Sequence, residues 1–370
     1  MSEDGRRSAR GLIRPHLNDL PPYGTMESVA AVAKELGLDV SEISKLDGNE
    51  NPYGASPKVA SALGGFSGYH VYPDAGQTAV REAVGRYVGA EPEQIVLGSG
   101  SDEMLGMVAT LFLDPGDALI TAPPTFGMYE FLANIHNARL VAVPRREDFA
   151  LDLPAMERAL DKGAKLVYLA SPNNPTGNPV NLDEIERLLG HDAAVVVDEA
   201  YAEFAGESAV SLMAAHDNLI VVRTFSKWAG LAGLRAGYAV LPPDLVEIVW
   251  RAKVPYNLGV ASEQAILASL DDADTLLENV RRTVEERERL RDRLAATGWI
   301  RPYPSAGNFV LCEIRGIAAG DVRDRLRARG ILVRYFDEPA LRNCIRISIG
   351  LPRDTDRVVD ALSEIGATVG

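Results

Sequence analysis

Residues Leu219 to Arg235 read LIVVRTFSKWAGLAGLR, an apolar strand that leads into a single lysine. The apolar run Leu219 to Val222 is typical of a buried strand. Lys227 follows in Gly- and Ala-rich surroundings, where loss of water disfavours the ammonium form and makes the amine more nucleophilic toward carbonyls. Together with Ser226 and Arg235 it forms a suitable set for an aldehyde cofactor that carries a phosphate. Because an isolated Ser-Lys pair is more often an ordinary surface feature, the rest of the chain has to decide.

Composition restricts the class of protein. The chain has 370 residues, is 46% hydrophobic and carries a net charge of −14, which favours a globular protein and disfavours nucleic acid as a partner. This length predicts two domains, or one large domain with an appendage. The cysteines, Cys312 and Cys344, lie in apolar runs, which predicts buried thiols and a reducing compartment. No apolar run approaches the ~20 residues that span a bilayer, and the polar residues 1–10 resemble no signal peptide, so we expect a cytoplasmic protein.

Short apolar runs alternate with amphipathic segments from residue 94 onward. Strands are expected at 95–97, 118–120, 140–143, 164–169, 193–197 and 219–222. Continuous apolar strands separated by helices predict an α/β fold with a mostly parallel sheet that helices cover on both faces. Ligands of such sheets bind at the carboxyl ends of the strands. Ser101, Asn174, Asp198 and Lys227 each follow one of these strands, so they are expected at one edge.

The remaining segments suggest a division into three regions. Residues 1–45 are expected to form an extended arm and a helix at 25–36 that pack on a small domain. Residues 46–256 form the large domain. Residues 257–370 form one or two long helices over 261–296 and a small α+β domain with strands at 309–314, 331–334 and 344–349. The Glu/Arg stripe at 285–293 is interpreted as a solvated helix face.

The strand–helix junction Gly98-Ser99-Gly100-Ser101-Asp102-Glu103 is a candidate anion site. Free N–H groups at a helix start and small residues that permit close approach favour an anion there. The run lacks the third glycine of the dinucleotide fingerprint. By itself it is more typical of an ordinary turn capped by Ser101, because serine is a common helix cap.

Further polar groups lie at neighbouring strand ends. In Ser171-Pro172-Asn173-Asn174-Pro175-Thr176-Gly177 the prolines hold the turn, so that the Asn174 amide can donate to a ligand oxygen. Asp198 ends an apolar strand, and a carboxylate there requires a cationic partner, for which a pyridinium nitrogen is suitable. Tyr201 follows within one turn and could reach a phenolate oxygen.

These residues, in this order and spacing, resemble the signature of the fold-type-I pyridoxal-phosphate aminotransferases, and the resemblance covers nearly the whole chain. Within that superfamily, the flanking strips resemble the histidinol-phosphate aminotransferase family. The matching strips are Asn49-Glu50-Asn51-Pro52-Tyr53-Gly54, Tyr72-Pro73-Asp74, Pro124-Thr125-Phe126-Gly127-Met128-Tyr129, Val333-Arg334-Tyr335-Phe336 and Ile345-Arg346-Ile347-Ser348-Ile349-Gly350.

The resemblance implies pyridoxal 5′-phosphate as cofactor and a role for each matching residue. Lys227 would form the Schiff base and transfer the proton. The other cofactor contacts implied are Asp198 on the pyridine nitrogen, Tyr201 and Asn174 on the ring oxygen, Phe126 on the ring face, and Ser101, Asp102, Ser226 and Arg235 on the phosphate. Tyr72 would reach the phosphate of a neighbouring subunit in a homodimer. The substrate contacts implied are Tyr23, Asn51, Arg334 and Arg346, the last binding the phosphate of histidinol phosphate and a carboxylate of glutamate.

Some positions depart from the family pattern and leave the substrate open. Phe126 stands where tyrosine is frequent, Trp228-Ala229-Gly230 replaces a small-aromatic-Gly run, and Leu351-Pro352-Arg353 replaces Thr-x-Glu. An aromatic amino-acid aminotransferase and a phospho-amino-acid decarboxylase therefore remain alternatives on the same fold, and a non-enzymatic cofactor-binding regulator is a third. The scattered histidines show no metal-ligand spacing, so no metal is expected.

Overall fold

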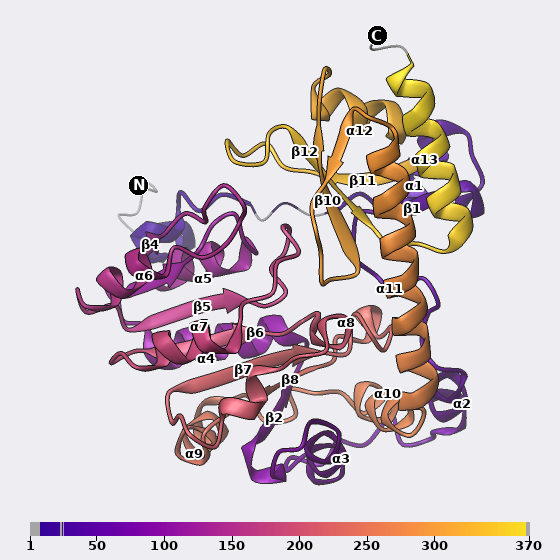
Figure 1. Ribbon diagram of the computed structural model, residues 1–370. Coiled ribbons are helices and arrows are strands. Elements are labelled where there is room, and N and C mark those ends of the chain that lie inside the picture. The colour runs from indigo at the N-terminus through magenta and orange to yellow at the C-terminus, as the bar shows by residue number, and fades with distance from the viewer. Residues whose placement is uncertain (1–7, 23, 25, 368–370) are drawn as a thin grey trace.

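The computed structural model describes residues 8–22, 24 and 26–367 and contains two β-sheets (Figure 1). The large sheet has the strand order β2-β8-β7-β6-β5-β3-β4. Its strands are β2 (Ile95–Gly98), β3 (Ala118–Thr121), β4 (Arg139–Ala142), β5 (Leu166–Ala170), β6 (Ala194–Asp198), β7 (Leu219–Thr224) and β8 (Gly237–Val240). The predicted α/β fold with a mostly parallel seven-stranded sheet is confirmed.

Strand β8 is the antiparallel member of this sheet and was missing from the predicted set. It pairs antiparallel with both β7 and β2. The link from β7 to β8 contains only the 3-10 turn Ala232–Leu234, and a parallel return requires a longer crossover. The Gly-rich stretch after Lys227 is therefore the turn that reverses the chain.

Alternate residues of the parallel strands enter separate cores on the two faces of the large sheet. Val195 and Val197 of β6 belong to one core, and Val196 belongs to the other. All three have no exposed surface. Burial on both faces explains why these strands are continuously apolar.

Helices surround this sheet. They are α2 (Pro57–Gly65), α3 (Thr78–Val88), α4 (Ser101–Phe112), α5 (Met128–His136), α6 (Leu153–Leu160), α7 (Leu182–Leu189), α8 (Ala202–Ala205), α9 (Pro243–Ala252) and α10 (Val260–Leu270). No helix of the described residues is long and apolar enough to cross a membrane.

The small sheet has the order β1-β11-β12-β10-β9. Its strands are β1 (Ser44–Leu46), β9 (Ile300–Pro302), β10 (Phe309–Ile314), β11 (Ile331–Tyr335) and β12 (Cys344–Ser348), and its helices are α12 (Ala319–Arg327) and α13 (Pro352–Gly366). Strand β1 pairs parallel with β11 far along the chain, which the sequence did not indicate. Both cysteines are free and buried in this part.

The N-terminal residues contact both parts of the molecule. The expected extended arm instead contains 3-10 turns. Ser8 caps the turn Ala9–Leu12, and the turn Pro15–Leu17 begins with a proline, which is compatible with the first position of a helical turn. His16 contacts the Ile135 carbonyl of α5 in the large part. Helix α1 (Val29–Leu36) begins later than predicted and lies against α12, where Glu35 pairs with Arg327.

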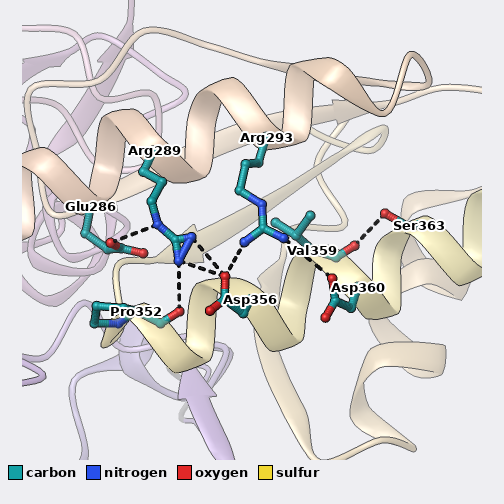
Figure 2. Close-up of polar contacts among 8 residues, drawn as sticks. All are labelled: Glu286, Arg289, Arg293, Pro352, Asp356, Val359, Asp360 and Ser363. Atoms are coloured by element: carbon teal, nitrogen blue, oxygen red, sulfur yellow. Dashed lines mark hydrogen bonds and ion pairs between the residues drawn. The ribbon is translucent and has the colours of Figure 1, made fainter.

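Helix α11 (Ala273–Ala296) runs along both parts and connects them (Figure 1). The predicted solvated stripe is partly wrong, because several of its charges face α13 (Figure 2). Arg289 contacts Asp356 at 2.7 Å, and Arg293 contacts Asp356 and, at 3.5 Å, Asp360. Arg287 is buried and donates to the Gly307 carbonyl at 3.0 Å.

Candidate active site

A cavity of about 560 Å³ lies at the carboxyl ends of the parallel strands, with walls from both sheets. Most of the residues singled out in the sequence line it. They are Ser101, Asp102, Phe126, Asn174, Asp198, Tyr201, Ser226, Lys227, Arg235, Arg334 and Arg346. The parallel topology explains why residues from separate strands converge, since all these strands end at the same edge.

Lys227 lies three residues beyond β7 and points its amine into this cavity. Removal from water, followed by repulsion from Arg346, lowers the pKa of its ammonium group to about 8. Its Nζ donates to the Gly48 carbonyl at 3.1 Å. A pKa this low makes an appreciable fraction of neutral, nucleophilic amine available near neutral pH.

Asp198 ends β6 and is 5% exposed. The Tyr129 hydroxyl donates to its Oδ2 at 2.9 Å, and the Ala200 N–H donates to its Oδ1 at 3.1 Å. Burial raises its pKa to about 7, against the lowering effect of the Tyr129 bond. Among the described residues no cationic side chain contacts this carboxylate, so its charge suits a cationic ligand group. Sequence reasoning missed Tyr129, although it lies in a strip that carried the family resemblance.

Tyr201 follows β6 and is also buried, at 5% exposure. Its ring meets Phe309 edge-on at 5.1 Å between centroids. The Asn49 side-chain nitrogen donates to its hydroxyl at 2.9 Å. Burial raises the pKa of the phenol, so the hydroxyl keeps its proton at neutral pH.

Residues at the start of α4 and around Arg235 form an anion cradle. The first N–H groups of a helix have no intrahelical acceptor, and α4 begins at Ser101 inside the cavity. Ser226 lines the same cavity, and its hydroxyl lies 2.9 Å from Thr224 Oγ1. Arg235 Nη2 lies 3.0 Å from Asp102 Oδ2.

Close backbone packing holds this cradle in place. A Cβ at Gly237 would lie 2.4 Å from the Ser101 nitrogen. Gly100 has a φ of +85°, and a Cβ there would lie 2.5 Å from Arg235 Nη2. Both glycines are therefore required for the helix start, β8 and the guanidinium to approach one another.

Arg334 and Arg346 form the wall that the small sheet contributes. They are directly opposite each other in the antiparallel pair β11–β12. Arg346 is 6% exposed, and its Nη2 donates to the Asp47 carbonyl at 2.5 Å. Burial and the neighbouring Arg334 lower the pKa of Arg346 to about 10. Its Nε has no hydrogen-bond partner among the described residues. Like charges directly opposite destabilise a sheet, so the pair is suited to an anion in the cavity.

Some predicted site residues lie elsewhere. Tyr72 is 78% exposed, stacks on Tyr256 at 4.7 Å and does not line the cavity. Asn51 donates to the Trp228 carbonyl at 2.8 Å and does not line the cavity either, so it holds the lysine-bearing turn. Tyr23 lies outside the described residues. No group of described His, Cys, Asp and Glu side chains could hold a metal ion.

Comparisons with known proteins agree with this geometry. The family model "Aminotransferase class I and II" matches residues 41–362. Histidinol-phosphate aminotransferase of Roseiflexus castenholzii is 48% identical, with 97% of this chain and 99% of the relative covered. The chloroplastic enzyme of Nicotiana tabacum is 41% identical, with 96% and 87% covered. A crystal structure of the Sinorhizobium meliloti enzyme in complex with pyridoxal-5'-phosphate superposes with a TM-score of 0.87 at 29% identity, with 96% and 98% covered.

Proposed function

We propose that this chain, which belongs to the family of class I and II aminotransferases, binds pyridoxal 5′-phosphate and acts on histidinol phosphate. The reaction would convert L-histidinol phosphate and 2-oxoglutarate into imidazole-acetol phosphate and L-glutamate, a step of histidine biosynthesis. The cross-strand pair Arg334 and Arg346 is the observation that carries this choice of substrate.

The cavity residues fit this cofactor. Asp198 is a buried carboxylate without a cationic partner among the described residues, which suits a pyridinium nitrogen. The α4 start, Ser226 and Arg235 line the cavity and suit a phosphate, and Gly100 and Gly237 allow them to lie close together. Phe126 lies at the cavity wall, where its ring can stack on a planar ligand. When bound, the cofactor supplies an aldehyde that accepts amino groups and a ring that withdraws electrons.

The chain itself orients the reactants and moves one proton. Lys227 Nζ, with its lowered pKa, is suited to take a proton from the substrate carbon and return it on the cofactor side. Tyr201, which follows β6, and Asn174, in the loop after β5, would both donate to the ring oxygen from the edge of the large sheet. An ionised Asp198 would keep the ring nitrogen protonated.

The arginine pair discriminates between substrates by charge. A phosphate dianion can engage both guanidinium groups, whereas a single carboxylate needs one planar fork. In the second half-reaction a glutamate carboxylate would occupy the Arg346 side of the same site. Phenylalanine has no second anionic group that could bind to the two arginines. The arginine pair therefore favours histidinol phosphate over phenylalanine as the substrate. The second candidate function is a decarboxylase that acts on a phosphate-bearing amino acid.

A single-turnover absorbance experiment tests the assignment. Cofactor-loaded protein is mixed with L-histidinol phosphate or with L-phenylalanine, and conversion of the cofactor band to its amine form is followed. Fast conversion by histidinol phosphate and slow conversion by phenylalanine is the expected result. The reverse order would indicate an aromatic aminotransferase, and carbon dioxide release without amino transfer would indicate a decarboxylase.

We also propose a homodimer in which Tyr72 serves the neighbouring subunit's phosphate site. Large apolar side chains with 45% or more of their surface exposed are typical of an interface, and they include Tyr69, Val71, Tyr72, Val254 and Tyr256. Mixed dimers of the inactive variants Tyr72→Ala and Lys227→Ala test this. When the two variants are mixed 1:1 and subunits exchange at random, about half of the dimers are mixed and each has one restored site, so the mixture would recover about a quarter of the wild-type activity. No recovery would mean that Tyr72 does not act across an interface.

The remaining proposals concern location and division of the chain. We place the protein in the cytoplasm, because both cysteines are free thiols. The regions 1–45, 46–256 and 257–370 remain our proposed division, with Tyr23 expected to cover the substrate. Limited proteolysis with mass spectrometry of the fragments would test these boundaries.

A further inference from the structure

Asn49 connects the small sheet to Tyr201 in the wall of the cavity. It lies in the loop that leaves β1, is 1% exposed and has a φ of 52°. Its Nδ2 donates to the Tyr201 hydroxyl at 2.9 Å. The two residues belong to different parts of the molecule, since β1 pairs with β11 whereas Tyr201 follows β6.

The orientation of the Asn49 amide is determined by its other contacts. Ser348 Oγ of β12 donates to Asn49 Oδ1 at 2.7 Å, and the Asn49 N–H donates to Ser348 Oγ at 2.9 Å. Asn308 Nδ2 donates to the Asn49 carbonyl at 3.0 Å. Because Oδ1 already accepts from Ser348, the NH₂ group is the side that faces Tyr201.

We propose that Asn49 is a positioning residue that turns the Tyr201 hydroxyl into a donor toward the cofactor's ring oxygen. A phenol has one proton to donate, and a hydroxyl oxygen that accepts from Asn49 directs this proton elsewhere. The cavity is the direction that remains, because Tyr201 lines it. The inference rests on the proposed cofactor, whose ring oxygen is the acceptor.

Asn49→Gly would remove the donor to Tyr201 without changing the charges around it. Arg346 favours the ionised phenol, Asp198 and Asp102 disfavour it, and the Lys227 amine lies 6.0 Å from the ring centroid. Since Asn49 is held by Ser348, the donor orientation of Tyr201 also depends on the small sheet lying against the large one. The packing of the small sheet against the large sheet would thus influence the charge on the ring oxygen of the bound cofactor.

The test is a pH titration of the cofactor absorbance band in loaded, substrate-free protein. Asn49→Gly suits the positive φ and removes the donor, whereas Asn49→Asp keeps the shape but accepts from Tyr201 and turns its proton away. A hydrogen bond from Tyr201 to the ring oxygen favours the charged form of that oxygen. Both variants lose this bond, so we expect the midpoint, the pH at which half of the absorbance change has occurred, to rise by about 1 unit. In a Tyr201→Phe background, Asn49→Gly is expected to cause no further shift.

Asn137→Gly is the matched control, because Asn137 has a φ of 53° at the end of α5 and does not line the cavity. If Asn49→Gly does not fold, Asn49→Asp and Ser348→Ala carry the test. Unchanged midpoints, or shifts that add to that of Tyr201→Phe, would overturn this inference alone. A wild-type protein with no cofactor band would overturn the proposed function and this inference with it.

Discussion

Arg346 of β12 donates through Nη1 to Asn174 Oδ1 at 2.5 Å, across the cavity from the small sheet to the loop after β5. The side-chain oxygen of Asn174 is thereby occupied, and its NH₂ group is left to donate to a ligand. The residue proposed to bind the substrate's anion therefore also orients a residue proposed to bind the cofactor ring.

Replacing Arg346 by Gln should weaken both half-reactions. The variant loses a charged donor to the substrate and the fork that holds Asn174, so KM for histidinol phosphate and for glutamate should rise about 100-fold. Arg334→Gln should affect histidinol phosphate more than glutamate. Arg342→Gln is the control, because Arg342 lies in the loop before β12 and its side chain is 62% exposed. An effect of Arg346→Gln on only one substrate would contradict a shared anion site.

Replacing Lys227 by Ala should abolish turnover while leaving the fold intact. The cavity loses the only group proposed to move the proton, so we expect the rate of amino transfer to fall by at least about 1,000-fold. Lys165→Ala removes a lysine that pairs with Asp117 on the surface and should have wild-type kinetics. Circular dichroism and steady-state rates check both variants. Wild-type turnover without Lys227 would refute the assignment.

Asp198→Asn should stabilise the cofactor-free protein at high pH. Burial raises the folded-state pKa of Asp198 from 3.8 to about 7. Between these values the folded protein retains a proton that the unfolded chain has lost, so the free energy of unfolding decreases as pH rises. Asn does not titrate, so the stability of the variant does not decrease in this way. Its free energy of unfolding should be higher than that of wild type by up to about 4 kcal/mol at about pH 8, but not at about pH 4. Urea unfolding of both proteins measures this difference, and equal stability at both pH values would contradict the raised pKa.

Gly237→Ala should weaken cofactor binding through the anion cradle. Its Cβ would meet the Ser101 nitrogen at 2.4 Å, and a backbone atom cannot move aside cheaply. The start of α4 would have to shift, which we expect to raise the Kd for pyridoxal 5′-phosphate by about 10-fold or more. Gly233→Ala is the control, because nothing lies within 4 Å of a Cβ there. Fluorescence titration of the cofactor distinguishes the two variants, and equal Kd values would show that the cradle is not tightly packed.

The ion pairs between α11 and α13 should contribute little to stability (Figure 2). Asp356 contacts Arg289 and Arg293, but its side chain is 54% exposed, so solvent screens the attraction. Asp356→Ala should therefore lower the free energy of unfolding by less than about 1 kcal/mol, and this difference should decrease as the salt concentration rises. Leu290→Ala, at a position on α11 that is 1% exposed, should cost about 3 kcal/mol. A larger cost for Asp356→Ala would mean that these charges hold the two helices together.

The sequence by itself predicted the parallel sheet and most residues that line the cavity. Apolar runs define buried strands locally, and the chain direction then brings Asn174, Asp198 and Lys227 to the same edge. Lys227 could also be recognised by its apolar neighbours, because they already determine whether its amine is removed from water.

Only the tertiary structure decided which groups meet across the molecule. Tyr129 reaches Asp198, Asn49 reaches Tyr201, and Arg334 stands opposite Arg346. It also assigned β1 to the small sheet and turned Tyr72 away from the cavity of its own chain. These contacts join residues from separate elements, and their partners are selected by the packing of whole sheets and helices. Local pattern carries no information about such packing, because the same hydrogen-bonding groups could pair with many other partners.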